Sequence, residues 1–270
     1  MMFQRTATTI ENVSLAERTF RIRLHVPEIA RTIRPGQFVM LRLPGTSDPL
    51  LGRPFALYDT DTTDSFDVVY LVVGKMTGLL AAVKSGDPIE IWGPLGNGFL
   101  DVGQPDQVTL VAGGIGQTPF LAYARQLLGE RGYGGDSPKR ITPSVRLYYG
   151  VRTANLVAGV SDFEGAGVKV HLASDDGSIG QRGFVTDLLK ADSPPGPWIA
   201  CGPEPMLHAV MKLAAEKNVV CHVSLETPMA CGFGACFSCV TKVKTSDGWD
   251  YKRVCVEGPV FDATQLCAER

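Results

Sequence analysis

The sequence predicts a multi-domain protein made of an antiparallel β-barrel, an α/β domain with a parallel sheet, and a small C-terminal domain of β type. Three observations support this fold class. Apolar and polar residues alternate in short stretches through residues 5–92, apolar strands alternate with helical patterns through residues 108–217, and cysteine and glycine dominate the remainder. We expect the three domains to span residues 1–103, 104–221 and 222–270.

The composition of the chain excludes several functional classes. With 270 residues, 44% of them hydrophobic, the chain can form two cores and a small appendage. Its net charge is only −2 and acids and bases are mixed along it, which argues against nucleic acid or an anionic membrane as a partner. Residues 1–13 lack a basic segment followed by an apolar run, and no stretch reaches the roughly 18 apolar residues that span a bilayer. We therefore expect a cytoplasmic protein whose partners are small molecules or proteins.

Short strands separated by glycine, proline and aspartate characterise the predicted barrel. The strand candidates are Thr19–His25, Gln37–Leu43, Phe66–Val73 and Pro88–Trp92. Arg53–Ala56 lies between two of them, where the arginine can hold a diphosphate while the extended backbone after it faces a flat ring. A surface arginine at the end of a strand is the alternative. The loop Gly74–Gly78, with a hydroxyl and amides for phosphate oxygens, and the turn Gly93–Phe99 favour a flavin site.

A glycine-rich turn follows the first strand of the predicted α/β domain. It separates the apolar run Val108–Ala112 from the helical pattern Pro119–Leu128, so that a pyrophosphate can approach a helix N-terminus. Because proline takes the place of the third glycine of the usual fingerprint, a structural turn is the alternative. A second such turn follows the strand candidate Trp198–Cys201. The candidate dinucleotide-binding residues are Gly113, Gly114, Gly116, Pro119, Cys201, Gly202 and Pro203.

The rest of this domain alternates strands and helices, which predicts a parallel sheet covered by helices. Strand candidates lie at Val145–Tyr149 and Val168–Ala173, and helix candidates at Val185–Lys190 and Glu204–Lys217. The glycine-rich, charged segment 129–143 is expected to be an exposed insertion.

Two acidic residues bear on the choice of dinucleotide. Asp175 and Asp176 follow a strand candidate, where carboxylates accept the hydroxyls of an adenosine ribose and repel a 2′-phosphate. Arg152 follows the preceding strand and favours a phosphate instead. The balance favours NAD(H) as co-substrate over NADP(H), and a solvated turn is the alternative for both acids.

Four of the seven cysteines fall together near the C-terminus. Cys231, Cys236, Cys239 and Cys255 reproduce the C-x4-C-x2-C…C spacing of plant-type 2Fe-2S ligation. The alternative is a structural zinc site, which more often shows two C-x2-C pairs. Cys221 and Cys267 lie apart from this cluster and have the pattern of small buried hydrophobes. A domain this small cannot be stabilised by apolar burial alone, so we expect the metal centre to stabilise it.

Taken in order, the motifs Arg53–Ala56, Gly93–Phe99, Gly113–Pro119 and Cys201–Pro203 resemble those of the ferredoxin reductase superfamily. Within it, three further segments are similar to the electron-transfer subunit of class 1B dihydroorotate dehydrogenases; they are Asp175–Gly180, Ser224–Cys239 and Arg253–Phe261. The resemblance implies that FAD contacts Arg53, Pro54, Phe55, Ala56, Tyr70, Leu71, Val72, Met76 and Thr77, and that the four clustered cysteines hold a 2Fe-2S cluster. Two residues depart from the family pattern: Met76 stands where glycine is common, and Ala56 where a hydroxyl residue is common.

The resemblance also implies a function. FAD exchanges hydride with NAD(H), and the cluster relays single electrons to or from the flavin of a partner. The four histidines are dispersed and no catalytic base is evident, so no catalytic residue is assigned. The resemblance places the oxidation of dihydroorotate to orotate, a step of pyrimidine biosynthesis, on a catalytic FMN-containing subunit in a heterotetramer of two copies each. The alternatives are the reductase component of another oxidoreductase system with the same cofactors, and a zinc-stabilised, non-catalytic binding module.

Overall fold

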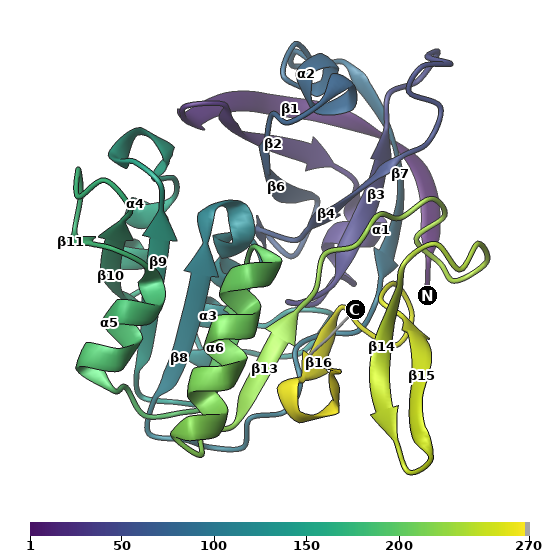
Figure 1. Cartoon of the computed structure of the whole chain (residues 1–270). Helices are drawn as coiled ribbons and strands as arrows, with labels where there is room; N and C mark the ends of the chain where they lie inside the picture. Colours follow the sequence, from purple (N-terminus) through teal and green to yellow (C-terminus); the bar gives the residue numbers. More distant parts are fainter. Residues whose placement is uncertain (268–270) are drawn as a thin grey trace.

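The computed structural model describes residues 1–267, which fold into two seven-stranded sheets and a two-stranded hairpin (Figure 1). The first sheet is antiparallel, and the second is parallel apart from its last strand. The hairpin comes from the C-terminal part of the chain. The fold class predicted from the sequence is therefore confirmed.

The N-terminal sheet has the strand order β4-β3-β7-β1-β2-β6-β5 and curls into a half-barrel. Its strands are β1 (Phe3–Ala16), β2 (Thr19–His25), β3 (Phe38–Arg42), β4 (Arg53–Ala56), β5 (Asp59–Thr60), β6 (Ser65–Leu71) and β7 (Pro88–Leu95). Ile89 and Ile91 of β7 are fully buried, because the pleat directs alternate residues toward a shared core. The curl brings β4 to β6, where the rings of Phe55 and Tyr70 meet edge to face at 6.0 Å.

Two parts of the half-barrel differ from the sequence expectation. The expected loop after Gly74 is helix α2 (Lys75–Leu80), because Thr77 Oγ1 accepts hydrogen bonds from the N–H groups of Val73 and Gly74 and caps the helix. The long strand β1 was not expected. Its buried positions include Ala7 and Thr9, whose small and weakly apolar side chains give little alternation signal. A short helix, α1 (Pro27–Ala30), follows β2.

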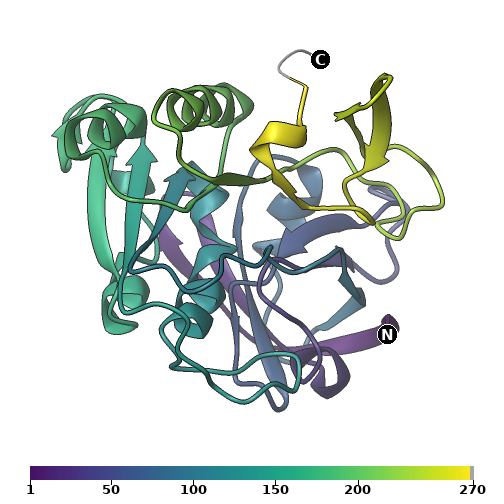
Figure 2. The ribbon, with the colours of Figure 1, turned by 90° about the horizontal axis from the view of Figure 1, so that it is seen from below.

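The second sheet has the order β11-β10-β9-β8-β12-β13-β16. Its strands are β8 (Val108–Gly113), β9 (Val145–Val151), β10 (Lys169–Ser174), β11 (Gln181–Arg182), β12 (Trp198–Cys201), β13 (Cys221–Ser224) and β16 (Val260–Asp262). Every residue of β8 is buried, as expected for a strand covered on both faces. The helices α5 (Val185–Asp192) and α6 (Glu204–Glu216) cover one face, and α3 (Phe120–Leu127) and α4 (Val160–Gly165) cover the other (Figure 1, Figure 2).

The segment 129–143 is not simply the exposed insertion that its composition predicts. Tyr133 is fully buried and its hydroxyl donates a hydrogen bond of 2.8 Å to Asp59 Oδ1 in the half-barrel. The partner that buries this ring lies far away in sequence, so local composition carries no sign of it. The segment therefore joins the first two parts of the molecule.

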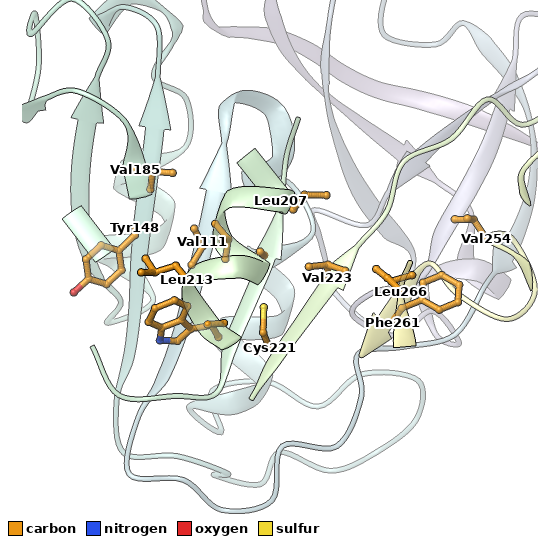
Figure 3. Close-up of a cluster of buried hydrophobic side chains, with 14 of the residues drawn as sticks. Val111, Tyr148, Val185, Leu207, Leu213, Cys221, Val223, Val254, Phe261 and Leu266 are labelled. Carbon is orange, nitrogen blue, oxygen red and sulfur yellow. The ribbon is translucent and has the colours of Figure 1, made fainter. Parts of the chain in front are cut away.

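The C-terminal part returns to the second sheet. After the hairpin of β14 (Val240–Thr245) and β15 (Gly248–Arg253), strand β16 pairs antiparallel with β13. Three residues of this C-terminal part, Val254, Phe261 and Leu266, belong to the same hydrophobic core as Val223 (Figure 3). Strand β13 crosses the expected boundary at residue 222, and residues 268–270 of the expected domain lie outside the described part of the chain. The domain limits stay a prediction.

Candidate functional site

The strand that carries the candidate flavin residues lies at an edge of the half-barrel. β4 pairs with β3 alone, in the register Leu41↔Arg53 to Phe38↔Ala56. Arg53 is exposed, and within residues 1–267 its guanidinium makes no ion pair, although Nη1 donates to the carbonyls of Leu51 and Gly52. Its remaining donors are therefore free to bind a phosphate group.

Apolar side chains in the loops before β4 and after β6 are left uncovered. Leu50 and Val73 are 61% and 72% exposed, and Leu51 is half exposed. Their loops adjoin, because Lys75 Nζ forms an ion pair with Asp48 Oδ2. A cationic side chain next to open apolar surface fits a flat ring that ends in a diphosphate, so these residues fit FAD.

Three of the expected flavin residues are engaged elsewhere. The side chain of Met76 is buried in the core of the half-barrel, and Thr77 Oγ1 caps α2. Tyr70 is buried, its hydroxyl donates to Asn12 Oδ1 at 3.0 Å, and desolvation raises its pKa to about 12. In this conformation Met76 and Thr77 offer a ligand backbone groups only. Pro54, Phe55, Leu71 and Val72 are half-buried around the place where β4 meets β6.

The two turns of the second sheet lie in direct contact. A Cβ atom on Gly116 would stand 2.3 Å from the carbonyl oxygen of Cys201, and one on Gly113 would stand 2.8 Å from Cδ of Pro203. The strands that lead into the turns are neighbours, with Cys201 opposite Ala112. These glycines are therefore required by the close approach of the second turn.

Gly114 differs from the other glycines of this turn. Its φ of +53° is in the left-handed region, and nothing lies within 4 Å of a Cβ atom placed there. Space is therefore open beside the backbone at this point, as the approach of a pyrophosphate requires. The adjoining Cys201 thiol is neutral, since desolvation, together with the charge of Glu226, raises its pKa to about 12.

Asp176 and Arg152 lie side by side, since the N–H of Asp176 donates to the Arg152 carbonyl at 3.3 Å. Asp176 Oδ1 accepts hydrogen bonds from the Ser178 hydroxyl at 2.6 Å and from its N–H at 2.9 Å, and both bonds lower the pKa of the exposed carboxyl. The acid is therefore ionised at the carboxyl end of β10, and Asp175 beside it is exposed.

The four clustered cysteines converge in two pairs. The N–H of Val254 donates to the Cys239 carbonyl at 2.7 Å, which brings buried Cys239 next to buried Cys255. Burial, together with the neighbouring Cys239 thiol, raises the pKa of Cys255 to about 12. A hydrogen bond from Ser238, reinforced by Cys231, lowers the pKa of exposed Cys236 to about 6.

This arrangement of donors fits a two-iron cluster. A 2Fe-2S cluster requires two thiolates per iron, which the pairs Cys231/Cys236 and Cys239/Cys255 can supply. All four donors are sulfur, a ligand chemistry that iron-sulfur clusters and zinc share.

Two residues that bear on the site were missed by sequence reasoning. Trp92 donates from Nε1 to the Cys231 carbonyl at 2.8 Å, although 139 positions separate the two residues. Asp59 binds Arg125, Arg131 and Tyr133 across the interface of the half-barrel and the second sheet. No local sequence pattern marks either residue.

A half-barrel with an arginine on its edge strand, a parallel sheet with paired glycine turns, and a four-cysteine loop define a flavoprotein of the ferredoxin reductase type with an iron-sulfur module. Two family models match the chain. The "Oxidoreductase FAD-binding domain" matches residues 5–99, and the "Iron-sulfur cluster binding domain of dihydroorotate dehydrogenase B" matches residues 226–267.

Curated relatives identify the family more narrowly. The chain is 39% identical over 256 residues to the dihydroorotate dehydrogenase B (NAD(+)) electron transfer subunit of Geobacillus kaustophilus, covering 93% of this chain and 94% of the relative. It is 38% identical over 234 residues to that of Clostridium acetobutylicum, covering 87% and 86%. The chain belongs to the family of dihydroorotate dehydrogenase B electron transfer subunits, and is an oxidoreductase subunit with FAD-binding and iron-sulfur-binding domains.

Solved structures share the fold over most of the chain. An NADH-dependent reduced ferredoxin-NADP oxidoreductase, described in connection with flavin-based electron bifurcation, matches with a TM-score of 0.81 and 28% identity over 97% of this chain and 89% of the other. A cytochrome P450 reductase from Amycolatopsis matches with a TM-score of 0.66 and 28% identity over 80% and 67%. Within residues 1–267, no helix combines the length and apolar character needed to cross a bilayer.

Proposed function

We propose that this chain carries electrons between NAD(H) and a catalytic flavoprotein subunit that oxidises dihydroorotate to orotate. FAD would be held at Arg53–Ala56, a 2Fe-2S cluster at the four clustered cysteines, and NAD(H) at the paired turns around Gly114 and Cys201. The partner would contain FMN, in an assembly of two copies of each subunit. FAD supplies the exchange between two-electron and one-electron chemistry, because a nicotinamide delivers hydride and a cluster takes single electrons.

The observation that carries the proposal is the position of the cysteine loop on the half-barrel. A Cβ atom on Gly232, next to Cys231, would stand 2.7 Å from Cγ of Met40 and 3.0 Å from Cδ1 of Leu95. Met40 lies on β3, the strand that pairs with β4. One wall of the half-barrel therefore supports both the flavin strand and the cluster loop, as a short relay requires.

The chain's own residues bind and orient rather than move protons. Desolvation lowers the pKa of His171 and His222. None of the four histidines lies in the flavin motif, the paired glycine turns or the cysteine loop, so deprotonation of dihydroorotate is assigned to the partner subunit. Asp175 and the ionised Asp176 favour NAD(H), because a 2′-phosphate beside them would be repelled.

The test uses anaerobically purified chain, assayed for flavin, iron and sulfide and scanned before and after NADH. About one FAD and about two irons per chain, with bleaching of both chromophores by NADH but not by NADPH at equal concentration, would support the proposal. A colourless, zinc-containing protein that ignores NADH would overturn it.

The identity of the client needs a second measurement. NAD+ reduction that depends on dihydroorotate, and that appears only when a catalytic FMN subunit is added, would support the assignment. If NADH bleaches the chain but no such coupling appears, the chain serves another oxidoreductase system.

A further inference from the structure

Trp92 lies in the wall of the half-barrel between the two proposed cofactor sites. It is a half-buried residue of β7, with Gln4 of β1 opposite it on one side and Met40 of β3 on the other. Among residues 1–267, its indole nitrogen donates a single hydrogen bond, and the acceptor is the carbonyl of Cys231, at 2.8 Å. Cys231 is the first of the proposed cluster ligands.

The six-membered ring of the indole lies against the residue before the flavin strand. A Cβ atom on Gly52 would stand 2.4 Å from Cη2 and 3.1 Å from Cζ2 of Trp92. Only glycine therefore allows this contact, and Gly52 directly precedes Arg53. The indole thus connects the backbone of the flavin motif to the backbone of a cluster ligand.

The loop that receives this hydrogen bond is pressed against the barrel wall. Gly232 has φ +80°, and Met40 and Leu95 fill the space that a side chain at this position would need. Other hydrogen bonds also restrain the loop, among them Ala230 N–H to Ser238 Oγ at 3.2 Å and Arg253 Nη1 to the Gly234 carbonyl at 3.2 Å. Both join parts of the C-terminal segment to each other, whereas the bond from Trp92 joins the loop to the half-barrel.

We propose that Trp92 is a positioning residue for electron exchange between flavin and cluster: its indole fixes the cysteine loop at the start of the flavin strand. The inference rests on the proposed function and adds a residue to it. The bond reaches a backbone carbonyl rather than a thiolate, so it acts by orienting the Cys231 peptide and by fixing the distance between the two sites.

The test compares Trp92→Phe, which keeps an aromatic ring and removes the hydrogen bond, with Gly52→Ala, which displaces the ring. Trp249→Phe is the matched control, because Trp249 is 53% exposed on β15 and lies over Lys242. Each variant is loaded with flavin and iron and mixed with NADH in a stopped-flow instrument. The flavin and cluster absorbances are followed separately, and the cluster's paramagnetic resonance spectrum and reduction potential are recorded.

We expect flavin reduction by NADH at the parent rate in Trp92→Phe, followed by cluster reduction that is several-fold slower, with an altered resonance spectrum. Gly52→Ala should change the rate of cluster reduction and the resonance spectrum in the same way. Trp249→Phe should change neither of them. Cluster reduction within about twofold of the parent, with an unchanged spectrum, in a loaded Trp92→Phe would overturn the proposal. If Trp92→Phe does not retain iron, the rate of cluster reduction and the spectrum are compared between the parent and Gly52→Ala instead, and an unchanged result there would overturn the proposal. A parent protein whose cluster is not reduced by NADH would refute the proposed function instead.

Discussion

Replacing Asp59 by asparagine tests the interface between the half-barrel and the second sheet. The Asp59 side chain is 11% exposed. It accepts hydrogen bonds from Arg125 Nη1 in α3, from Arg131 Nη1 at 3.0 Å, and from the Tyr133 hydroxyl at 2.8 Å. Three side chains of the α/β part, one from α3 and two from the segment 129–143, therefore meet on one carboxylate of β5.

The cost of the substitution follows from the burial of these groups. Asparagine keeps the shape but removes the charge, and leaves two guanidinium groups, 18% and 30% exposed, without this anion. Removing one partner of a buried ion pair costs about 3–5 kcal/mol. Arg125 keeps a contact with Glu130 at 3.5 Å and Arg131 retains some water, so we expect about 3 kcal/mol.

The assay is urea unfolding of parent and variant, followed by circular dichroism. Asp64→Asn is the control, because Asp64 pairs with Arg31 at 3.0 Å while the two side chains are 52% and 61% exposed. Its loss should cost less than about 1 kcal/mol. If the two variants unfold with free energies within about 0.5 kcal/mol of each other, the argument from burial is wrong.

Three further changes test individual sites. Cys255→Ser should reduce iron from about two per chain to a small fraction while flavin content stays at the parent level, as measured by metal analysis and absorbance; full iron retention would contradict the ligand assignment. Arg53→Ala should weaken FAD binding at least about tenfold in a fluorescence titration and leave iron unchanged, since one charge-assisted contact to a diphosphate is lost. Burial alone would raise the pKa of Asp61, but hydrogen bonds from the N–H groups of Ser65, Thr63 and Asp64 and from the Ser65 hydroxyl hold it well below its usual value. The stability that this carboxylate contributes is thus present above its usual pKa of about 4 and is lost as the pH falls below that value. Asp61→Asn should therefore lower the free energy of unfolding by about 1 kcal/mol near neutral pH and by less near about pH 3. A loss of stability that grows on acidification would refute this.

Much of the fold was predictable where one strand or helix carries its own signal. Strand β2 spans Thr19–His25 as predicted, and α6 ends within one residue of the predicted helix Glu204–Lys217. Periodicity is a property of neighbouring residues, so it survives in the sequence. Strand β1 and helix α2 were missed because small buried residues and a side-chain cap produce no such period.

The candidate site likewise has features that could be predicted from the sequence and features that could not. Its residue types were predictable, because the C-x4-C-x2-C spacing and the glycine turns are local chemistry. The environments of the Met76 and Thr77 side chains could not be predicted. The core of the half-barrel buries Met76, and Thr77 caps α2. For these two residues the predicted contact with FAD stays a prediction that only backbone groups can fulfil.

The order of the parts and the set of donors for each proposed cofactor can be predicted from the amino-acid sequence, since ligand chemistry depends on residue type and short spacing. How the parts meet is visible only in the folded molecule. The bond from Trp92 to Cys231, the convergence on Asp59 and the pairing of β13 with β16 each close a long stretch of chain. Such contacts form when separately folded surfaces pack, and no local pattern specifies which distant residue will be the partner.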